Sequence, residues 1–426
     1  MNLFVNDPIV RGDIISASYI FNGTKYIHDF IAPATINVTD PTAQRLARWV
    51  ALIHSLYLFN VEYFTILEAG FCLDQEEIAF FEKLIFNGMA EFRVENYIPI
   101  NTKTVVFSHQ TTNLKTNMPE INHKSEGRLL LNGGGKDGIV SNILLTESGL
   151  NFDFFQVGTS KAQANVARHF SKKPVIFRRL MDERRKDGKF SGHRPTSAAI
   201  AITAILSAYL LGKFDVIASN ETSSNEPNLT IEGVKVNHQY SKSFEFEKDL
   251  SELLSVYGIP VRYFSILRPI HEIQIAKILV KYPEYSSIFI SCNHGFRKGF
   301  WCMKCPKCAF ITLILNSVSP KFADGTLGED CINTPKLKKH IVSLINHEED
   351  KPFECVGTLE ECKIAAKLIL EGKQIKIDAD LYNLFLKHTS DIKQDQIEDI
   401  LNGFDSKHCI PSPDYDDIIE QLKTIS

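Results

Sequence analysis

Apolar runs alternate with stretches of helical periodicity through the middle of the chain. Six of these runs are typical of buried strands, at residues 128–131, 152–156, 175–177, 214–218, 261–267 and 287–291. Helical patterns follow them in turn, near residues 139–147, 160–170, 197–211, 245–256, 270–282 and 306–317. Strands that alternate with helices predict a parallel sheet covered on both faces, so the expected fold class is α/β with a doubly wound parallel sheet.

The region before this core has a different pattern. Alternating and amphipathic positions predict an antiparallel pair of strands and then two helices, over residues 14–21, 25–30, 42–59 and 75–86. The polar stretch 101–126 is interpreted as a linker. Residues 1–125 are therefore expected to form an N-terminal α+β domain with a substrate or accessory role.

The region after Pro320 is polar and helical. Leu337, Ile341 and Leu344 fall on one helical face, and Thr358–Glu361 is a capping box that opens a helix. We therefore expect a core over residues 126–319 and a helical C-terminal appendage over residues 320–426.

Composition narrows the class of protein. The chain has 426 residues, of which 44% are hydrophobic and 23% charged, which is enough for a large core and two or three domains. A net charge of -4 argues against nucleic-acid binding. The longest apolar run, 197–211, is too short to span a bilayer, and no secretory signal is evident, so we expect a cytoplasmic protein without a membrane partner.

The first candidate for chemistry is the turn that follows the first predicted core strand. The segment Arg128–Gly138 reads Arg-Leu-Leu-Leu-Asn-Gly-Gly-Gly-Lys-Asp-Gly and leads directly into a helical pattern. Glycines allow close approach of the backbone to an anion, and the N-terminus of a helix favours negative charge. The segment therefore predicts a site for a nucleotide phosphate.

Three glycine-rich loops compete for this segment. The P-loop of kinases and GTPases is excluded, because Leu130 stands in place of its first glycine and Asp137 in place of its magnesium-binding hydroxyl residue. The dinucleotide pattern G-x-G-x-x-G is met by Gly133, Gly135 and Gly138, but no acid follows the next strand to hold a ribose. We favour the loop of the N-type ATP-pyrophosphatases, roughly S-G-G-x-D-S, which gives Asp137 a role.

A cysteine array is the second candidate. Cys292, Cys302, Cys305 and Cys308 have the spacing C-x9-C-x2-C-x2-C, which suits a tetrahedral zinc site, with an iron–sulfur cluster as the alternative. With nine cysteines and no sign of export, disulfides are not expected. The five other cysteines, interpreted as ordinary buried or helical residues, are Cys72, Cys331, Cys355, Cys362 and Cys409.

Polar segments next to predicted core elements supply further candidates. His193 and Arg194 precede the longest apolar helix, which places them at its positive end. The segments 219–228 and 236–247 follow a strand, where loops carry function more often than elsewhere. A basic group is interpreted either as a clasp for substrate phosphates or as a solvated face, namely Arg178, Arg179, Arg184, Arg185 and Lys186.

Six motifs together resemble one family. The sequence is similar to the MurL-type UDP-N-acetylmuramoyl-L-alanyl-L-glutamate epimerases, and its core resembles 7-cyano-7-deazaguanine synthase, with an adenine nucleotide alpha hydrolase-like PP-loop fold. Gly138 stands where serine usually follows the loop aspartate. The motifs that carry the resemblance are Gly133–Asp137, Gly192–Pro195, Glu221–Glu226, Val236–Glu247, Trp301–Cys308 and Lys351–Thr358.

The resemblance implies an ATP-dependent epimerase with a small-molecule substrate, a UDP-muramoyl dipeptide, in peptidoglycan precursor synthesis. Adenylation of the terminal glutamate would remove the carboxylate charge and acidify the α-proton, since the carbonyl can then carry the developing oxyanion. A base would take this proton from one face, and an acid would return it on the other. Water would then release AMP, after pyrophosphate has left.

Each candidate residue receives a role on this interpretation. ATP would bind at Gly133, Gly134, Gly135, Lys136, Asp137 and Gly138, with Asp137 positioning Mg²⁺. Zn²⁺ would bind the four cysteines. His238 is the first candidate for proton transfer, with His193, Lys242 or Glu226 opposite, whereas Glu221, Asn225 and Arg194 are expected to bind substrate or metal.

Two other classes of function remain open from the sequence. A related adenylating enzyme would act on a different acceptor, such as a deazaguanine acid or a tRNA base. A non-catalytic version would only bind ATP, and the sequence does not define the oligomeric state.

Overall fold

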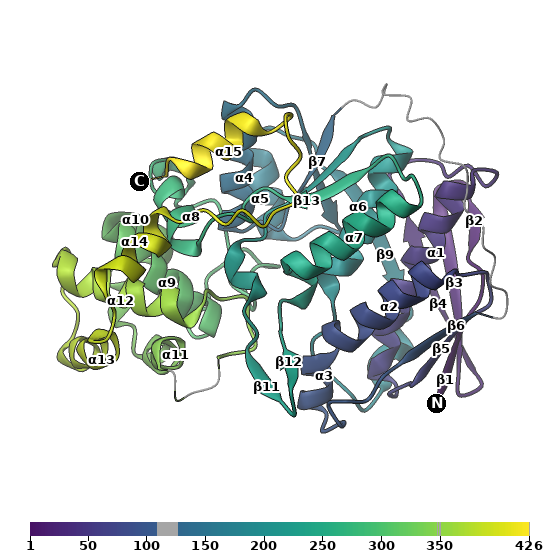
Figure 1. The fold of residues 1–426 in the computed structure, drawn as a ribbon, viewed down its shortest axis with the longest axis horizontal. Helices are drawn as coiled ribbons and strands as arrows, with labels where there is room; N and C mark the ends of the chain where they lie inside the picture. The colour runs from purple at the N-terminus through teal and green to yellow at the C-terminus, as the bar shows by residue number, and fades with distance from the viewer. Residues whose placement is uncertain (109–126, 347, 349–350, 426) are drawn as a thin grey trace.

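The protein is a mixed α/β structure built on a large, mostly parallel sheet. The computed structural model describes residues 1–108, 127–346, 348 and 351–425. Figure 1 shows the sheet between layers of helices, with the N-terminal strands at one side and the C-terminal helices at the other. No helix within these ranges is long and apolar enough to cross a membrane.

The predicted core strands form the parallel half of the sheet. They are β7 (Arg128–Leu131), β8 (Asp153–Val157), β9 (Val175–Met181), β10 (Asp215–Ala218) and β13 (Arg262–Ser265). Their order is β13-β10-β7-β8-β9, so the direction of winding reverses beside β7. Ligands of open parallel sheets bind at such a reversal, at the carboxyl ends of the strands, and the glycine loop follows β7 there.

One predicted core strand is wrong. Residues 287–291 form no strand, although Ile290 donates a backbone hydrogen bond to Gly134 at 2.9 Å. The apolar residues Phe289 and Ile290 are buried beside the glycine loop. Burial of a short connecting segment therefore produced the same apolar pattern as a strand.

Helices cover both faces of the parallel half, as the sequence predicts. Leu130 packs on one face against α4 (Lys136–Glu147) and α8 (Glu272–Leu279), whereas Leu129 packs on the other against α6 (Thr196–Leu210). Because both faces of β7 are covered by helices, side chains that point to either face are buried, which explains why the strand is apolar at consecutive positions. The other core helices are α5 (Lys161–His169), α7 (Phe244–Val256) and α9 (Pro306–Val318).

The N-terminal strands extend the same sheet. The predicted antiparallel pair is confirmed as β3 (Ile14–Phe21) and β4 (Thr24–Ile31), and β4 pairs antiparallel with β9 of the core. The leading unit therefore shares its sheet with the core. Its other elements are β1 (Asn2–Val5), β2 (Ile9–Arg11), β5 (Ile66–Ala69), β6 (Val105–Ser108), α1 (Pro41–Ser55), α2 (Gln75–Gly88) and α3 (Ala90–Glu95).

The predicted linker 101–126 includes β6, which adds to the edge of the sheet beside β5. Residues 101–104 precede this strand, and residues 109–126 lie outside the described residues. A two-stranded ribbon in the core pairs β11 (Leu229–Ile231) with β12 (Val234–Val236). Short 3₁₀ turns occupy Leu56–Asn60, Glu183–Asp187, Thr222–Asn225, Tyr240–Lys242, Pro283–Tyr285 and Cys331–Asn333.

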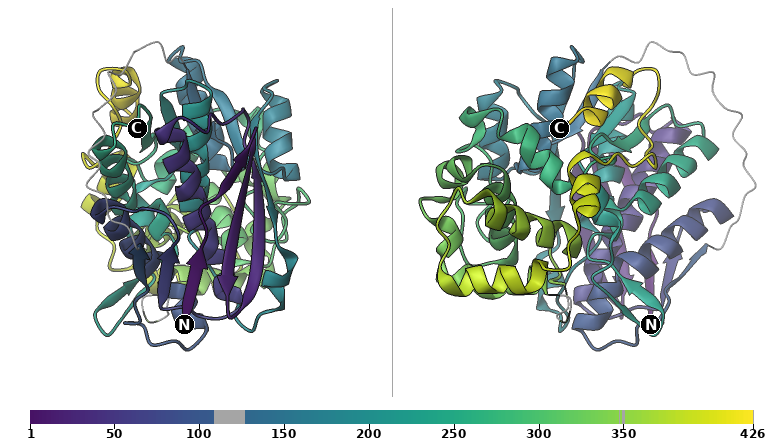
Figure 2. Two further views of the ribbon diagram at one scale, coloured as in Figure 1. Left: turned by 90° about the vertical axis from the view of Figure 1, so that its right-hand side faces the viewer. Right: turned by 60° about the vertical axis from the view of Figure 1, so that its left-hand side comes forward.

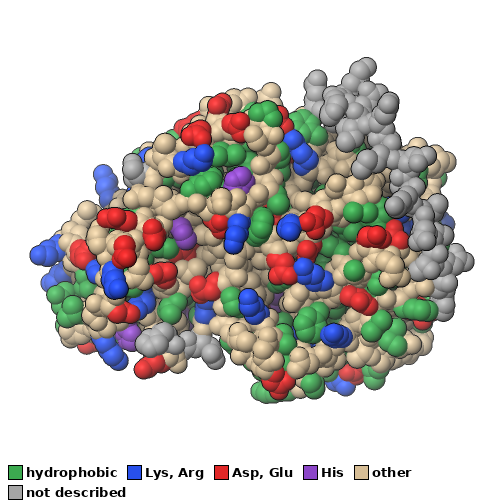
Figure 3. All heavy atoms as spheres, in the orientation of Figure 1, with side chains coloured by type: hydrophobic (Ala, Val, Ile, Leu, Met, Phe, Trp, Pro, Cys, Tyr) green, Lys and Arg blue, Asp and Glu red, His purple; other side chains and the backbone are tan. Residues whose placement is uncertain are grey.

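The C-terminal region consists of helices, as predicted: the first three pack against α9, whereas the last lies apart from α9, near α4 (Figures 1 and 2). They are α10 (Pro320–Leu327), α11 (Pro335–Ile345), α12 (Leu359–Gly372), α13 (Ala379–Thr389), α14 (Gln394–Asn402) and α15 (Asp416–Lys423). The predicted capping box is present at the start of α12, where Thr358 and Glu361 cap each other. Acidic and basic side chains are interspersed over the face in Figure 3.

Candidate active site

The glycine loop is a tight bend fastened to α5. Gly134 has a φ of 77°, and a Cβ atom there would lie 2.7 Å from backbone atoms of Ala162 and Gln163. Only glycine fits this position. Asn132 closes the bend by accepting a hydrogen bond from the Gly134 N–H at 3.0 Å. Gly133 is exposed, so the outer side of the bend is open to a ligand.

At the start of α4, the Lys136 N–H donates to the Ser291 hydroxyl at 3.4 Å. Gly135 occupies the N-cap position and offers no side chain to the free amides of the first turn. A Cβ at Gly138 would meet only the Leu131 carbonyl oxygen, at 3.8 Å. The site therefore has room for the hydroxyl residue that Gly138 replaces.

Lys136 lies beneath the loop and does not face solvent. Its ammonium group is fully buried and forms ion pairs with Asp137 and Glu272. Although burial would lower the pKa of Lys136, the charges of Asp137, Glu272 and Glu221 raise it. Burial in turn raises the pKa of Glu272 to about 8. Lys136 therefore pairs with Asp137 and Glu272 at the base of the loop, and Glu272 is a member of the site that the sequence interpretation missed.

The candidate residues between 221 and 226 point to different parts of the structure. Glu221 is buried and accepts a hydrogen bond from the Ser223 hydroxyl at 2.9 Å. Asn225 is exposed and accepts from the Phe244 N–H at 2.7 Å, which caps α7. Glu226 points to a different hollow, where Lys351 approaches its carboxylate at 3.4 Å.

A buried arginine organises these loops. Arg268 has no exposed surface and pairs with Glu247 at 2.9 Å. The same guanidinium group donates to the carbonyl oxygens of Glu221, at 2.7 Å, and of Lys242. Neither Arg268 nor Glu247 was a candidate from sequence. Their pairing fixes the two loops that carry Glu221, His238 and Lys242.

The predicted histidines lie together and meet a glutamate from the N-terminal unit. The Nδ1 atom of His238 lies 2.6 Å from Oε2 of Glu91, and its ring centre lies 4.2 Å from that of His193. Burial, together with the charges of His238 and Lys242, lowers the pKa of His193 to about 2. His193 is therefore neutral near pH 7.

His238 carries the opposite charge state. Burial alone would lower the pKa of His238, but hydrogen bonds to Cys355 and Glu91 raise it to about 10. It is therefore an imidazolium at neutral pH, able to donate a proton rather than accept one. Because the two histidine rings are in contact, they approach a ligand from the same side.

Cys355 joins this group from the C-terminal region. Its thiol accepts a contact from Lys242 Nζ at 3.0 Å and a hydrogen bond from His238. Burial alone would raise the pKa of Cys355, but Lys242, His238 and Lys307 lower it to about 5. The sequence interpretation took Cys355 as an ordinary buried residue, although the motif 351–358 that contains it was already one of the six that carry the resemblance.

The segment that carries Cys355 is fastened to the core on both sides. Asn228 donates to the Pro352 carbonyl oxygen at 2.7 Å, and Lys307 donates to the carbonyl oxygen of Cys355 itself. Immediately afterwards the capping box starts α12. The position of the thiol is therefore set by the core as well as by its own helix.

Two lysines connect the thiol with the glycine loop. Although burial would raise the pKa of Asp137, Lys136, Lys307 and Lys242 lower it, and Lys242 and Lys307 also lower that of Cys355. Both ends of the site are therefore within electrostatic range of the same cations. A ligand anchored at the glycine loop has cationic side chains between it and the thiol.

The four predicted cysteine ligands lie together. Their sulfur atoms are all within 4.8 Å of one another, and those of Cys302 and Cys308 are 3.8 Å apart. Tetrahedral bonds of about 2.3 Å from zinc to sulfur correspond to a sulfur separation of about 3.8 Å. Backbone N–H groups point at Cys292 and Cys305, as they do at thiolate ligands. The residues therefore fit a structural zinc ion.

The predicted basic cluster divides into two sets. Arg184 and Lys186 pair with their neighbours Asp182 and Glu183, and Arg178 lies exposed on β9. These three side chains belong to an ordinary surface. They give no support to a phosphate clasp at those residues.

Arg179, Arg185 and Arg194 instead surround one tyrosine. Their guanidinium carbons lie 5.6, 5.9 and 5.8 Å from the ring centre of Tyr57. The buried Nε atoms of Arg185 and Arg194 have no hydrogen-bond partner within the described residues. Arg194 follows His193 directly, so this arginine cluster borders the histidines and is suited to an anion.

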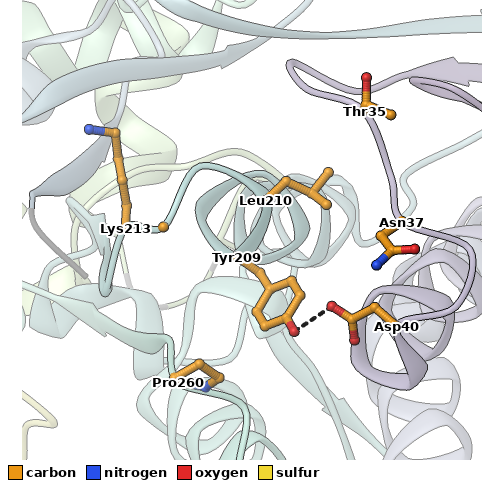
Figure 4. Close-up of a pocket in the computed structure, with 8 residues that line it drawn as sticks. Thr35, Asn37, Asp40, Tyr209, Leu210, Lys213 and Pro260 are labelled. Atoms are coloured by element: carbon orange, nitrogen blue, oxygen red, sulfur yellow. Dashed lines mark hydrogen bonds between the residues drawn. The ribbon is translucent and has the colours of Figure 1, made fainter. Parts of the chain in front are cut away.

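A further hollow lies at the opposite ends of the strands (Figure 4). It is lined by Asp40, Tyr209 and Lys213, and the Tyr209 hydroxyl donates to Asp40 at 2.7 Å. Lys213 precedes β10, so this hollow is at the amino end of that strand. We do not assign it to the site, because ligands of parallel sheets bind at the carboxyl ends.

Comparison with known proteins covers both parts of this site. The family model for the MurL N-terminal domain matches residues 13–266, and that for the MurL C-terminal domain matches residues 288–399. The first match contains the glycine loop, His193 and His238. The second contains the cysteine array and Cys355. No solved structure has a significant match to the chain.

Three curated relatives carry the name UDP-N-acetyl-alpha-D-muramoyl-L-alanyl-L-glutamate epimerase. The protein from Salinispora tropica is 30% identical over 352 residues, which are 78% of this chain and 75% of that protein. The protein from Micromonospora sp. is 34% identical over 57% of this chain and 56% of its own length. The protein from Xanthomonas oryzae pv. oryzae is 26% identical over 82% of this chain and 80% of its own length.

Proposed function

The chain belongs to the MurL family, and on this premise we propose that it inverts the terminal L-glutamate of a UDP-N-acetylmuramoyl-L-alanyl-L-glutamate to D-glutamate. The names of the relatives support an enzyme of the isomerase kind. Its product would enter peptidoglycan precursor synthesis. The substrate is a small anionic molecule with a diphosphate and free carboxylates.

We propose that ATP activates the α-carboxylate as an acyl-adenylate. The observation that carries this proposal is the bend at Gly133 and Gly134, which lies at the reversal of the sheet, is exposed at Gly133 and leads into α4, where Gly135 offers no capping side chain. The β,γ-diphosphate of ATP would bind there. Asp137, Glu221 and Glu272 would hold Mg²⁺, which prefers carboxylate oxygens.

Loss of the carboxylate charge is the reason for the activation. A carbanion beside a carboxylate would place two negative charges on adjacent groups, whereas an acyl carbonyl can accept the charge. Cations near the carbonyl would stabilise it further, and the charges of Lys242 and Lys307 act on both Asp137 and Cys355. The geometry therefore favours acyl chemistry between Asp137 and the histidines.

Proton transfer is assigned to the histidine side of the site. Neutral His193 can accept a proton, although its pKa of about 2 makes it a weak base, and the cationic His238 and Lys242 have the charge state of acids. The rings of His193 and His238 are in contact and would act from one side of the substrate. We therefore assign the opposite face of the α-carbon to Lys242. Glu226 contacts Lys351 in another hollow and is the weakest of the four candidates.

The substrate's anionic groups are assigned to the arginine cluster. Arg179, Arg185 and Arg194 surround Tyr57 next to the histidines, and two of their buried Nε donors are free to bind a diphosphate or carboxylate. Zn²⁺ would bind the four cysteines and serve the fold, since all four coordination positions are taken by protein.

One incubation tests the proposed function. UDP-N-acetylmuramoyl-L-alanyl-L-glutamate, ATP and Mg²⁺ are mixed with the protein in D₂O, and the glutamate is hydrolysed and resolved by chirality. We expect D-glutamate with deuterium at the α-carbon, one AMP per inversion, and pyrophosphate. Inversion without AMP would contradict the adenylate, and substrate-independent binding of ATP without turnover would favour the non-catalytic module.

A second assay separates the acceptors. Pyrophosphate exchange into ATP is measured with the L,L-dipeptide substrate and with a deazaguanine carboxylic acid. Exchange that depends on the dipeptide supports the epimerase. Exchange that depends on the deazaguanine acid would support the related adenylating enzyme instead.

A further inference from the structure

The roles assigned above leave one reactive group without a function. Cys355 is partly exposed, and its sulfur contacts the ammonium of Lys242 at 3.0 Å. Its other neighbour is the imidazole of His238, which is held by Glu91 at 2.6 Å. Structural cysteines in apolar surroundings have no such cationic neighbours.

These residues form a relay of carboxylate, imidazole and thiol. Glu91 orients the ring of His238 through Nδ1, and the charged ring in turn stabilises the thiolate of Cys355. An imidazolium oriented by a third group is an arrangement that keeps a neighbouring thiol ionised as a nucleophile. Lys242 adds a second positive charge to the sulfur, so the structure favours a resident thiolate.

The three members come from three regions of the chain. Glu91 lies on α3 of the N-terminal unit, His238 follows β12, and Cys355 precedes α12. The thiol is separate from the four-sulfur group, because only Cys292, Cys302, Cys305 and Cys308 form that group within the described residues. The second group of possible ligands, Glu91, His193 and His238, lies beside the thiol and does not include it.

The thiol is also influenced by the same cations as the proposed nucleotide site. Lys242 and Lys307 interact electrostatically with both Asp137 and Cys355. An acyl-adenylate whose phosphate is held near Asp137 would extend its carbonyl toward these two lysines. The electrophilic carbon of that group would then lie on the side where Cys355 is found.

We propose that the Cys355 thiolate, held between Lys242 and His238, attacks the acyl-adenylate and carries the glutamyl group as a thioester while its α-proton is exchanged. This inference rests on the proposed function, because it needs the adenylate. It adds a covalent intermediate and a catalytic nucleophile to that function. Glu91 is a positioning residue for His238.

The step balances without a further reactant. A bond forms between the sulfur and the acyl carbon, the bond from that carbon to the phosphate oxygen breaks, and AMP leaves with the electron pair. One group removes the α-proton and another supplies a proton on the opposite face. Water then cleaves the carbon–sulfur bond, which releases the D-glutamyl carboxylate and restores the thiolate.

The thiolate suits a nucleophile better than a general base. Proton acceptors work best with a pKa near the operating pH, whereas that of Cys355 is about 5. A strongly stabilised thiolate is a weak base but stays ionised and attacks carbonyl carbon at neutral pH. A thioester also keeps the α-proton acidic after AMP has left, because sulfur donates little electron density to its carbonyl.

The test uses Cys355→Ala and Cys355→Ser in the full chain, with Cys72→Ser as the matched control. Cys72 lies in the N-terminal unit, outside this site. With substrate labelled in its glutamyl residue, wild type and Cys72→Ser are quenched in acid during turnover. We expect label on the precipitated protein, located at Cys355 by mass spectrometry and released by hydroxylamine.

Two activities are compared in the same proteins. In both Cys355 variants, we expect α-deuterium exchange and inversion to fall by roughly 1,000-fold or more. Substrate-dependent pyrophosphate exchange should stay within about threefold of wild type, since adenylation precedes the thiol step. Retained exchange also shows that the variants are folded.

Three results would overturn the inference. They are inversion by Cys355→Ala at the wild-type rate, the absence of acyl label from wild type during turnover, and loss of pyrophosphate exchange together with inversion in both folded variants. All three leave the proposed function standing if wild type still forms D-glutamate and AMP. Failure of wild type to consume ATP with the dipeptide would instead refute the proposed function itself.

Discussion

Nδ1 of His238 lies 2.6 Å from Oε2 of Glu91, so a helix of the N-terminal unit orients a side chain of the core site. The same ring hydrogen-bonds Cys355, which belongs to the C-terminal region. One imidazole therefore connects the three regions that the sequence pattern separates. The site is complete only when all three are packed together.

The first prediction concerns pH. The pKa of Cys355 is lowered to about 5 and that of His238 is raised to about 10, so the thiolate and the imidazolium coexist between these values. We expect kcat/KM to rise as the pH increases through about 5, to stay level, and to fall through about 10. Glu91→Gln should move the alkaline limb to lower pH, because it removes a group that raises the pKa of His238.

Glu76→Gln is the control for this profile, since Glu76 is exposed in the first turn of α2. Its pH dependence should match that of wild type. An unchanged alkaline limb in Glu91→Gln would show that the carboxylate does not set the charge of His238.

The second prediction compares two glycines of the loop. Gly134→Ala should abolish ATP-dependent turnover, because its Cβ would lie 2.7 Å from the backbone of α5 at a positive φ. Gly138→Ala should fold normally and gain about 0.5–1 kcal/mol, because it replaces glycine within α4 and its Cβ meets nothing closer than 3.8 Å. Urea unfolding and pyrophosphate exchange measure both, and equal behaviour of the two variants would contradict this account.

The third prediction concerns the buried pair of Arg268 and Glu247. Arg268→Met leaves the Glu247 carboxylate buried without its partner, which should destabilise the protein by about 3–5 kcal/mol. The double variant Arg268→Met with Glu247→Leu should recover much of this loss. Chemical denaturation gives the free energies of unfolding, and a single variant as stable as wild type would refute the organising role.

The fourth prediction concerns the cysteine array. Cys305→Ser should lose bound zinc, lower the melting temperature and reduce turnover, because Lys307 two residues later holds the carbonyl oxygen of Cys355. Cys72→Ser should keep about one zinc per chain. Metal analysis and the absorbance spectrum identify the bound metal. A visible iron–sulfur spectrum would show that the four cysteines hold an iron–sulfur cluster and not zinc.

The fifth prediction concerns the arginine cluster around Tyr57. Arg185→Lys and Arg194→Lys should raise the KM for the UDP-linked substrate by about tenfold with a smaller change in kcat, because lysine cannot present two parallel donors. Arg184→Lys is the matched control, since Arg184 pairs with Asp182. An equal KM in all three variants would show that the arginine cluster does not bind the substrate.

Local patterns determined much of the fold. The five confirmed core strands, the helices between them and the cap at Thr358 follow from periodicity and capping residues close together in sequence. The bend at Gly134 and the spacing of the four cysteines are likewise local features. The prediction of a strand at residues 287–291 was wrong because a buried connecting segment is as apolar as a strand.

The composition of the site was decided by tertiary structure. Glu91 and His238 are 147 residues apart, Lys242 and Cys355 are 113 apart, and Lys136 and Glu272 are 136 apart. No periodicity extends over such separations, and the charge state of each group depends on burial and on partners that only packing supplies. The sequence by itself therefore determined which residues could react, and the folded chain decided which of them meet and with what charge.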